Sequence, residues 1–331
     1  MSRLRRVSRP AAAAAAVTVL AVTASGCVTV HGEREVLPAA TKAEAARALK
    51  DFTEAYNAAE AAADPAKDAK QVTGPFGAIN QAGLKARAER KKDGDELTAP
   101  TPLKLDDAKF TIPKQTGWPR WFVADTDSNK DKNGSFRWVM VFTRGGLDQS
   151  WEASYLAFVP PAKMPEFKKD KDGFAEPVDV DDAKLAVAPK NLSEEFASYL
   201  KDGGETFEDG PYTSSWRTKR EEEAEKAGLV TQYIDEPHNS GDFAPVGLRT
   251  KNGGALVFFS TRHYEKRTAA EGLNLRIGPD VRALMRGDAK SAVTLESAAA
   301  QTALVPPKKG GTTSQVRVLN RVQGLTGAKG E

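Results

Sequence analysis

The pattern of apolar and polar positions predicts two helices near the start of the chain. In the first, apolar side chains recur at spacings of three and four and stop before Pro65: Leu49, Phe52, Tyr56 and Ala59. Thr41 and Glu44 precede this run at capping-box spacing, so the helix is predicted to begin at Thr41. A second helix, interrupted by two glycines, is predicted over residues 76–92.

After residue 100 the period of the pattern changes from helical spacing to two, which is typical of half-buried strands. The predicted strands are residues 103–112, 120–125, 136–144 and 151–159. Turn-rich segments such as DSNKDKNG separate them. Two helices are therefore followed by an antiparallel meander.

The same order of elements recurs in the second half. Helices are predicted from Asn191, which caps together with Glu194, and after Ser215, ending near Gly228. The strands predicted after them are residues 229–235, 244–250, 255–263, 273–277, 293–305 and 315–325. Three pairs of short motifs stand at matching places: GPF with GPY, VFTR with FSTR, and LAFVPPAK with TALVPPKK. This recurrence predicts that the halves, residues 41–185 and 186–331, are copies of one unit.

A helix-helix-meander unit resembles the NTF2-like or cystatin-like α+β cone, in which a curled antiparallel sheet wraps a helix. From CVTVHG onward the chain also resembles an uncharacterised family of actinobacterial lipoproteins with tandem repeats of that kind. The resemblance implies an α+β fold of two tandem domains and an extracytoplasmic location. It implies no catalytic residues.

The first residues indicate export and lipid anchoring. Four arginines and no acid precede an apolar run over residues 11–22, which is too short to span a bilayer. Ala24, Ser25 and Gly26 then lead into Cys27, a segment that resembles the lipobox of bacterial lipoproteins, with Ala24 where Leu is commoner. A signal peptide is predicted over residues 1–26 and a lipidated tether over residues 27–40.

Acylation explains why the only cysteine of the chain stands at this position, since a lone thiol has no disulfide partner in an oxidising compartment. The predicted location is the outer face of the cytoplasmic membrane, with the membrane contacted through acylated Cys27. A secreted protein with a chance cysteine is the alternative. Both Sec and twin-arginine export remain open, because Arg5-Arg6 lacks the usual flanking pattern.

Charge and composition exclude several classes of function. Without residues 1–26 the formal net charge of +3 becomes −1, so no basic surface points to a nucleic-acid partner. The chain contains no G-x-S-x-G, S-x-x-K, H-E-x-x-H or phosphate-binding glycine loop after residue 26. We therefore expect no cofactor.

Two features of the sequence partly resemble metal sites, and neither predicts one. Residues 129–134 place Asn129, Asp131, Asn133 and Gly134 as in a calcium loop, but the twelfth position is Met140 and not a bidentate carboxylate. This loop and the KKDKDG segment at residues 168–173 are predicted to be polar turns. The three histidines, His31, His238 and His263, match no zinc spacing, so no metal is expected.

His263 is the one candidate catalytic residue. Strand alternation places it on the same face as Val257, Phe259 and Thr261, where NTF2-like enzymes keep acid-base groups. A partly exposed histidine at the end of a strand is the interpretation that the sequence favours. The alternative function is a hydrolase or isomerase that uses His263 with a nearby carboxylate.

Aromatic side chains of the first half are the candidate ligand-binding residues. Trp138, Met140 and Phe142 share one strand face, and Trp151, Ala153 and Tyr155 share another. Packing in the core around the first helix and lining of a pocket both explain them. The sequence as a whole predicts a non-catalytic module of the cell envelope that binds an unidentified ligand or protein, more by the first half than by the second.

Overall fold

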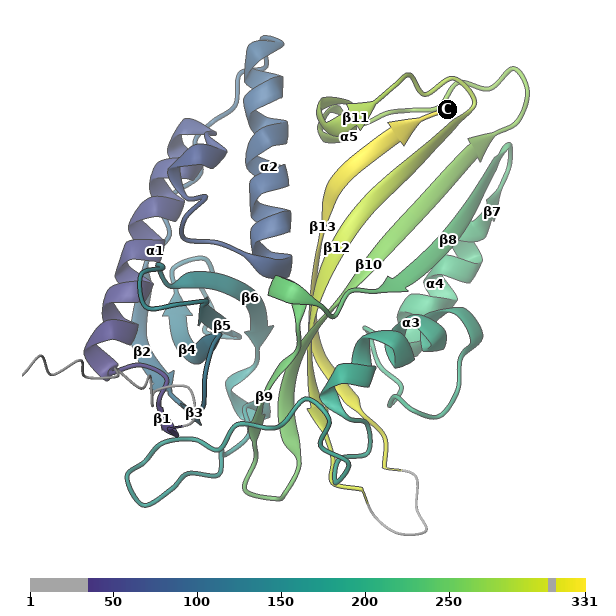
Figure 1. The fold of residues 1–331 in the computed structure, drawn as a ribbon. Helices are drawn as coiled ribbons and strands as arrows, with labels where there is room; N and C mark the ends of the chain where they lie inside the picture. Colours follow the sequence, from purple (N-terminus) through teal and green to yellow (C-terminus); the bar gives the residue numbers. More distant parts are fainter. Residues whose placement is uncertain (1–34, 309–313) are drawn as a thin grey trace, which may run out of the picture. The chain divides into compact units, whose positions relative to one another are not determined.

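The computed structural model describes residues 35–308 and 314–331 of the chain. They belong to one compact unit, Gly32–Glu331. The predicted signal peptide, Cys27, His31 and most of the tether lie outside the described residues. The fold is mixed α+β, with two principal sheets that are antiparallel except for one parallel pair of strands in the larger sheet, and helices pack on each sheet (Figure 1).

The first half contains two long helices and a four-stranded sheet in the order β2-β4-β5-β6. Its helices are α1 (Lys42–Ala62), the short turn η2 (Pro65–Lys67) and α2 (Gly74–Lys92). Its strands are β1 (Leu37–Pro38), β2 (Leu105–Thr111), β3 (Lys114–Gln115), β4 (Arg120–Ser128), β5 (Arg137–Arg144) and β6 (Glu152–Val159). The predicted capping box is confirmed, since Glu44 N donates to Thr41 Oγ1 (3.1 Å) and Thr41 N donates to the Glu44 carboxylate (2.8 Å).

The second half contains a seven-stranded sheet in the order β11-β13-β12-β10-β8-β7, and β9 also pairs with β10. Its helices are η3 (Pro161–Lys163), η4 (Pro189–Asn191), α3 (Leu192–Asp202), α4 (Ser214–Ala224), η5 (Gly241–Phe243) and α5 (Pro279–Leu284). Its strands are β7 (Glu225–Lys226), β8 (Leu229–Pro237), β9 (Val246–Arg249), β10 (Ala255–Ala269), β11 (Met285–Arg286), β12 (Ala292–Val305) and β13 (Arg317–Gly330). The strand predicted over residues 273–277 is wrong: the chain leaves a turn at Gly272, runs without regular structure through these residues and begins α5 at Pro279.

Three large apolar clusters hold the fold together, and a smaller fourth one packs α2 against α5. One packs α1 against the four-stranded sheet around Phe52, and a second packs α3 against the seven-stranded sheet around Phe196. The third joins the two sheets, since Val139 and Val141 of β5 share it with Leu256 of β10. The predicted boundary between residues 185 and 186 lies in the chain between β6 and α3 and stays a prediction.

The matched motifs occupy matching positions in the two sheets. β5 pairs with β6, and β10 pairs with β12. In the motif alignment Met140 corresponds to Phe258, and Leu156 corresponds to Thr302. Met140 lies directly opposite Leu156 in the first sheet, and Phe258 lies directly opposite Thr302 in the second. GPF begins α2, and one residue separates GPY from the N-terminus of α4.

Candidate functional site

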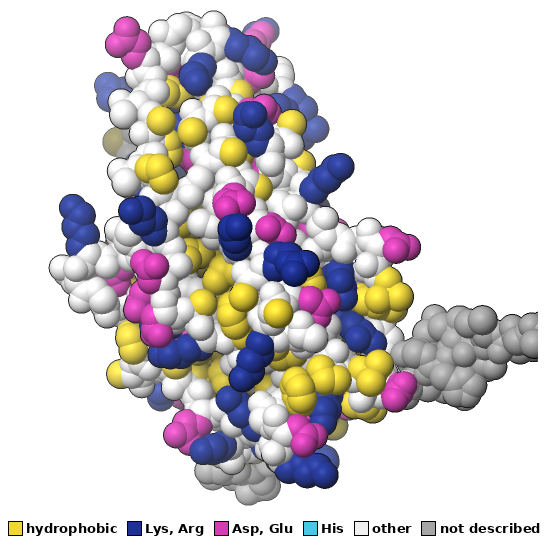
Figure 2. All heavy atoms as spheres, turned by 90° about the vertical axis from the view of Figure 1, so that its left-hand side faces the viewer, with side chains coloured by type: hydrophobic (Ala, Val, Ile, Leu, Met, Phe, Trp, Pro, Cys, Tyr) yellow, Lys and Arg dark blue, Asp and Glu magenta, His cyan; other side chains and the backbone are white. Residues whose placement is uncertain are grey.

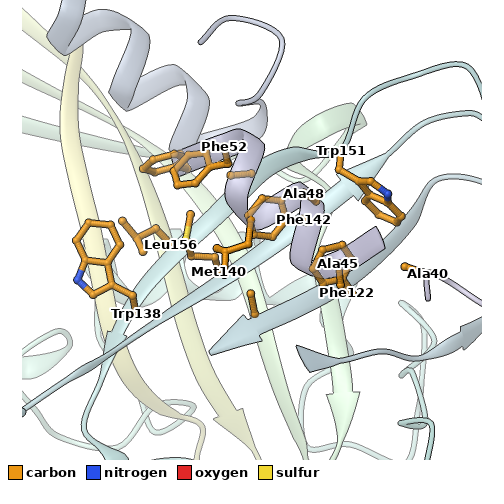
Figure 3. Close-up of a cluster of buried hydrophobic side chains, with 14 of the residues drawn as sticks. Ala40, Ala45, Ala48, Phe52, Phe122, Trp138, Met140, Phe142, Trp151 and Leu156 are labelled. Carbon is orange, nitrogen blue, oxygen red and sulfur yellow. The ribbon is translucent and has the colours of Figure 1, made fainter. Parts of the chain in front are cut away.

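The aromatic candidates of the first half lie in the core beneath α1. Trp138 and Trp151 are each 8% exposed, and Met140 and Phe142 are fully buried. Figure 3 shows four of the candidates, Trp138, Met140, Phe142 and Trp151, in the same buried cluster as Phe52, whose ring packs edge-on against Phe142 at 5.8 Å. These positions correspond to core packing, the first of the two interpretations left open.

Tyr155 lies on the opposite face of the sheet from Trp151 and Ala153, so the predicted shared face is wrong. The cause is a bulge: Phe142 pairs with Ala153 whereas Val141 pairs with Tyr155, which leaves Ser154 as an extra residue. Tyr155 consequently enters the cluster between the sheets, and its hydroxyl donates to the carbonyls of Phe243 (2.9 Å) and Ala244 (3.0 Å).

In the loop at residues 129–134 and in the segment at residues 168–173, an aspartate accepts hydrogen bonds from backbone N–H groups of its own turn. Asp131 accepts hydrogen bonds from the backbone N–H groups of Asn133 (3.1 Å) and Phe136 (2.6 Å). Asp170 accepts from Asp172 N (2.9 Å) and Phe174 N (3.0 Å). Over residues 35–308 and 314–331 no group of three or more histidine, cysteine or acidic side chains is arranged to hold a metal ion.

His263 is buried in the interior of a strand, contrary to the favoured interpretation of an exposed strand end. Its side chain is 3% exposed. β10 continues to Ala269, because the residues after His263 pair with β8 as far as Ala269 and with β12 as far as Thr268. Thr261, on the same face, places its hydroxyl oxygen 2.8 Å from His263 Nε2, and the side-chain amide of Gln301 lies 2.7 Å from that oxygen.

A buried carboxylate faces the other ring nitrogen of His263. Asp235 of β8 is directly opposite His263 in the register, and its Oδ1 accepts from His263 Nδ1 at 2.5 Å. Arg220 of α4 donates to both oxygens of the same carboxylate, at 2.7 and 3.0 Å. Both ring nitrogens of His263 are therefore engaged within the protein.

The electrostatics of this group favour a neutral imidazole. Burial lowers the pKa of His263, and the Asp235 carboxylate only partly opposes this effect. Burial also disfavours the charged form of Asp235, but hydrogen bonds from His263 and Arg220 outweigh it and lower the pKa of this carboxyl. Asp235 and Arg220 form the ion pair, and His263 completes the hydrogen bonding of the carboxylate.

A pocket of about 400 Å³ lies between α4 and the adjoining face of the seven-stranded sheet. His263 is part of its wall. From α4 it is lined by Ser215, Trp216, Lys219, Arg220 and Glu223, and from the sheet by Tyr233, Glu265, Ser297, Arg321 and Gln323. Trp216 packs edge-on against His263 (5.2 Å between rings) and also contacts two guanidinium groups, Arg220 at 3.9 Å and Arg321 at 3.2 Å from its ring centroid.

Sequence reasoning found His263 and missed its partners. Two signals were present: Trp216 and Arg220 are four residues apart on a predicted helix, and Tyr233 and Asp235 alternate on a predicted strand. Neither signal says which strands are neighbours. Arg321 follows His263 by more than fifty residues and reaches the site only because β12 lies between β10 and β13.

No helix within residues 35–308 or 314–331 has the length and apolar character needed to cross a membrane. The face of the molecule in Figure 2 carries lysine and arginine side chains interspersed with aspartate and glutamate. On this face the charges form no stripe of one sign.

Comparison with known proteins gives a family and several relatives. The chain is 56% identical to an uncharacterized lipoprotein of Streptomyces avermitilis over 99% of this chain and 97% of the relative. It is 54% identical to an uncharacterized lipoprotein of Streptomyces coelicolor over 99% of this chain and 98% of the relative. A second uncharacterized lipoprotein of that organism is 28% identical over 62% of this chain and 59% of the relative.

No solved structure matches the chain. A family model described as "Domain of unknown function (DUF8094)" matches residues 36–330, which is nearly everything after the predicted tether. The chain therefore belongs to the DUF8094 family.

Proposed function

We propose that this protein is a lipid-anchored envelope protein that binds a small ligand, without chemical conversion, in the pocket of its second half. The observation that carries the proposal is the state of His263. An open pocket lies beside a histidine whose two ring nitrogens are both within hydrogen-bonding distance of protein atoms. Such a site has room for a ligand but offers it no free base.

Two observations support the proposed lipid anchor: the position of Cys27 and the similarity of the chain to lipoproteins. Two lipoproteins that align over almost the whole chain support membrane attachment on the extracytoplasmic side. Acylated Cys27 would hold the protein at the outer face of the cytoplasmic membrane. The chain from Cys27 to the first described residue, Glu35, can extend about 25–30 Å at most, so the folded unit would stay close to the bilayer.

The second candidate function is a hydrolase or isomerase based on His263. The 2.5 Å contact between His263 and Asp235 favours it, because a carboxylate that orients an imidazole is a recurring part of acid-base sites. Against it stands Thr261, which engages the nitrogen that a substrate would need. The burial of the ring further removes it from a substrate.

We also propose that the two halves are diverged copies of one helix-helix-sheet unit of the NTF2-like or cystatin-like cone type. The equal cross-strand pairing of Met140 with Leu156 and of Phe258 with Thr302 supports this history. In the second half, β8 and β9 together pair with β10 along the edge that corresponds to the place of β4 beside β5. Binding by the second copy reverses the expectation that the first half carries the ligand.

A pocket-filling variant tests the binding function. Ser215 is exposed on α4 and lines the pocket, so Ser215→Trp should fill it. Thr218→Trp is the matched control, since Thr218 is exposed on the same helix outside this lining. The full-length chain in detergent is screened against a small-molecule library by thermal shift.

The proposal expects at least one compound that raises the melting temperature of the wild type and of Thr218→Trp but not of Ser215→Trp. Compounds that act equally on all three proteins, or no stabilising compound at all, would contradict it. Chemical conversion of a bound compound that His263→Gln abolishes would favour the enzyme instead. Binding of an envelope protein to the wild type that Ser215→Trp leaves intact would move the function to another surface.

A further inference from the structure

The acidic side chains in the pocket lining and directly behind it already have partners. Asp235 is held by His263 and Arg220, and both contacts are direct hydrogen bonds. The carboxylate of Glu265 accepts from Arg267 at 2.6 Å, and that of Glu223 lies 4.0 Å from Lys226 Nζ. None of these contacts uses Arg321 or Lys219.

Arg321 is a cation of the pocket lining that pairs with none of these acidic side chains. Within the described residues its guanidinium makes no hydrogen bond and no ion pair, and its Nη1 is enclosed without an acceptor. The side chain is held flat over Trp216, with its Cζ 3.2 Å from the ring centroid. Enclosing a guanidinium without a direct carboxylate partner costs free energy, and the nearby charge of Asp235 offsets that cost only in part.

The surroundings of Arg321 add to that cost. Burial and the nearby charge of Arg220 lower the pKa of Arg321 to about 9. The group is still a cation at neutral pH. An anionic oxygen beside it would offset both the lost hydration and the repulsion from Arg220.

Resting on the proposed binding function, we propose that the ligand carries an oxyanion, a phosphate or carboxylate group, which pairs with Arg321 of β13. Two oxygens of a carboxylate or phosphate group match the forked donors of a guanidinium. Lys219, exposed at the rim of the pocket on α4, supplies a second positive charge. Ser215, Ser297 and Gln323 add neutral hydrogen-bonding groups, and a volume of about 400 Å³ suits a small organic molecule.

Phenyl phosphate is the probe, because it joins an oxyanion to a ring of the size the pocket accepts. Phenol and inorganic phosphate separate the contributions of the two parts. The full-length protein in detergent is titrated by calorimetry at low salt as the wild type, Arg321→Gln, Arg321→Lys and Lys219→Gln. Arg276→Gln is the matched control, since Arg276 is exposed and lies outside the pocket lining.

We expect phenyl phosphate to bind the wild type and Arg276→Gln equally, and Arg321→Gln to weaken binding at least about tenfold. Arg321→Lys should recover part of the loss, and Lys219→Gln should weaken binding about two- to fivefold. Phenol should bind alike to the wild type and to Arg321→Gln. If Arg321→Gln does not fold, the Lys219→Gln titration and a fall in wild-type affinity with added salt carry the test.

Equal affinity of the wild type and a folded Arg321→Gln for phenyl phosphate would overturn the proposal. So would the absence of any binding of phenyl phosphate to the wild type. If a neutral library compound still binds and Ser215→Trp blocks it, the oxyanion proposal alone has failed. If no compound binds, the binding function has failed with it.

Discussion

Single side chains of this protein depend on partners that local sequence does not reveal. His263 was assigned correctly to a strand face with Thr261, but its burial follows from Asp235 and Arg220, which reach it from β8 and α4. Tyr155 points away from its predicted neighbours because one extra residue, Ser154, enters the strand pairing. Alternation predicts faces only until the first bulge.

His238 gives a pH-dependent stability at the residue scale. Burial and the charge of Arg262 lower its pKa to about 4, and its ring stacks on Phe243 at 3.5 Å. Between about pH 6.5 and pH 4 the unfolded chain binds a proton at this position and the folded chain does not, so stability falls as the pH falls.

We therefore expect the free energy of unfolding to drop between pH 7 and pH 5 more steeply in the wild type than in His238→Gln. Urea denaturation at the two pH values measures this difference. Parallel pH profiles of the two proteins would show that His238 titrates normally in the folded state.

Trp138 tests whether the aromatic residues of the first half are core. It is 8% exposed and packs edge-on against Phe158 at 5.3 Å. Trp138→Ala should lower the free energy of unfolding by about 3–5 kcal/mol, because it leaves a cavity in the cluster under α1. Phe136→Ala, at an aromatic that is 43% exposed, is the control and should change stability by about 0.5 kcal/mol or less. If Trp138→Ala lowers the free energy of unfolding only slightly, the first half becomes a candidate binding site again.

Elements with strong local signals were predictable. The capping box of α1 and the alternation in β5 and β6 gave the correct element types, and the matched motifs pointed to matching strand pairs. Strand ends were less predictable: β10 runs to Ala269 and β13 to Gly330, because partner strands on the sheet extend them beyond their apolar positions. The sequence could not show that Arg321 and Asp235 lie near each other, because strand order and register determine the distance between them.

Arg137 connects three strands of the first sheet. It is buried on β5 and pairs with Asp125 and Asp127 of β4 and with Asp107 of β2. Its Nη2 also donates to the carbonyl of Asp107 (2.8 Å), at an irregularity in the β2–β4 pairing where Asp107 has a φ of 48°. This single side chain makes ion pairs with three carboxylates and holds a bulge in place.

Arg137→Met should destabilise the fold toward the lower end of about 3–5 kcal/mol, because Asp107 and Asp127 can still be hydrated once their partner is gone. Arg286→Met removes an exposed ion pair to Glu296 and should cost about 1 kcal/mol or less. Chemical denaturation of both variants checks the difference. Equal, small effects would mean that the three aspartates do not depend on Arg137.

At the scale of the whole molecule, the proposed attachment to the membrane would depend on Cys27, which lies outside the described residues. Cys27→Ser removes the thiol to which the lipid would be joined. In cells that express this variant we expect the protein to move from the membrane fraction to the medium, while a Ser25→Ala control stays in the membrane. Retention of Cys27→Ser in the membrane at wild-type levels would contradict a lipid anchor.

The central claim is that the anchored molecule carries a ligand in the pocket between α4 and the seven-stranded sheet. The most direct measurement is native mass spectrometry of the full-length protein purified from the membranes of a Streptomyces host, with Ser215→Trp prepared in parallel. The account predicts a small molecule that is bound one to one to the wild type, is released on denaturation and is missing from Ser215→Trp. The same mass bound to both proteins, or a wild type that carries nothing and takes up no compound added from the host's envelope extract, would contradict it.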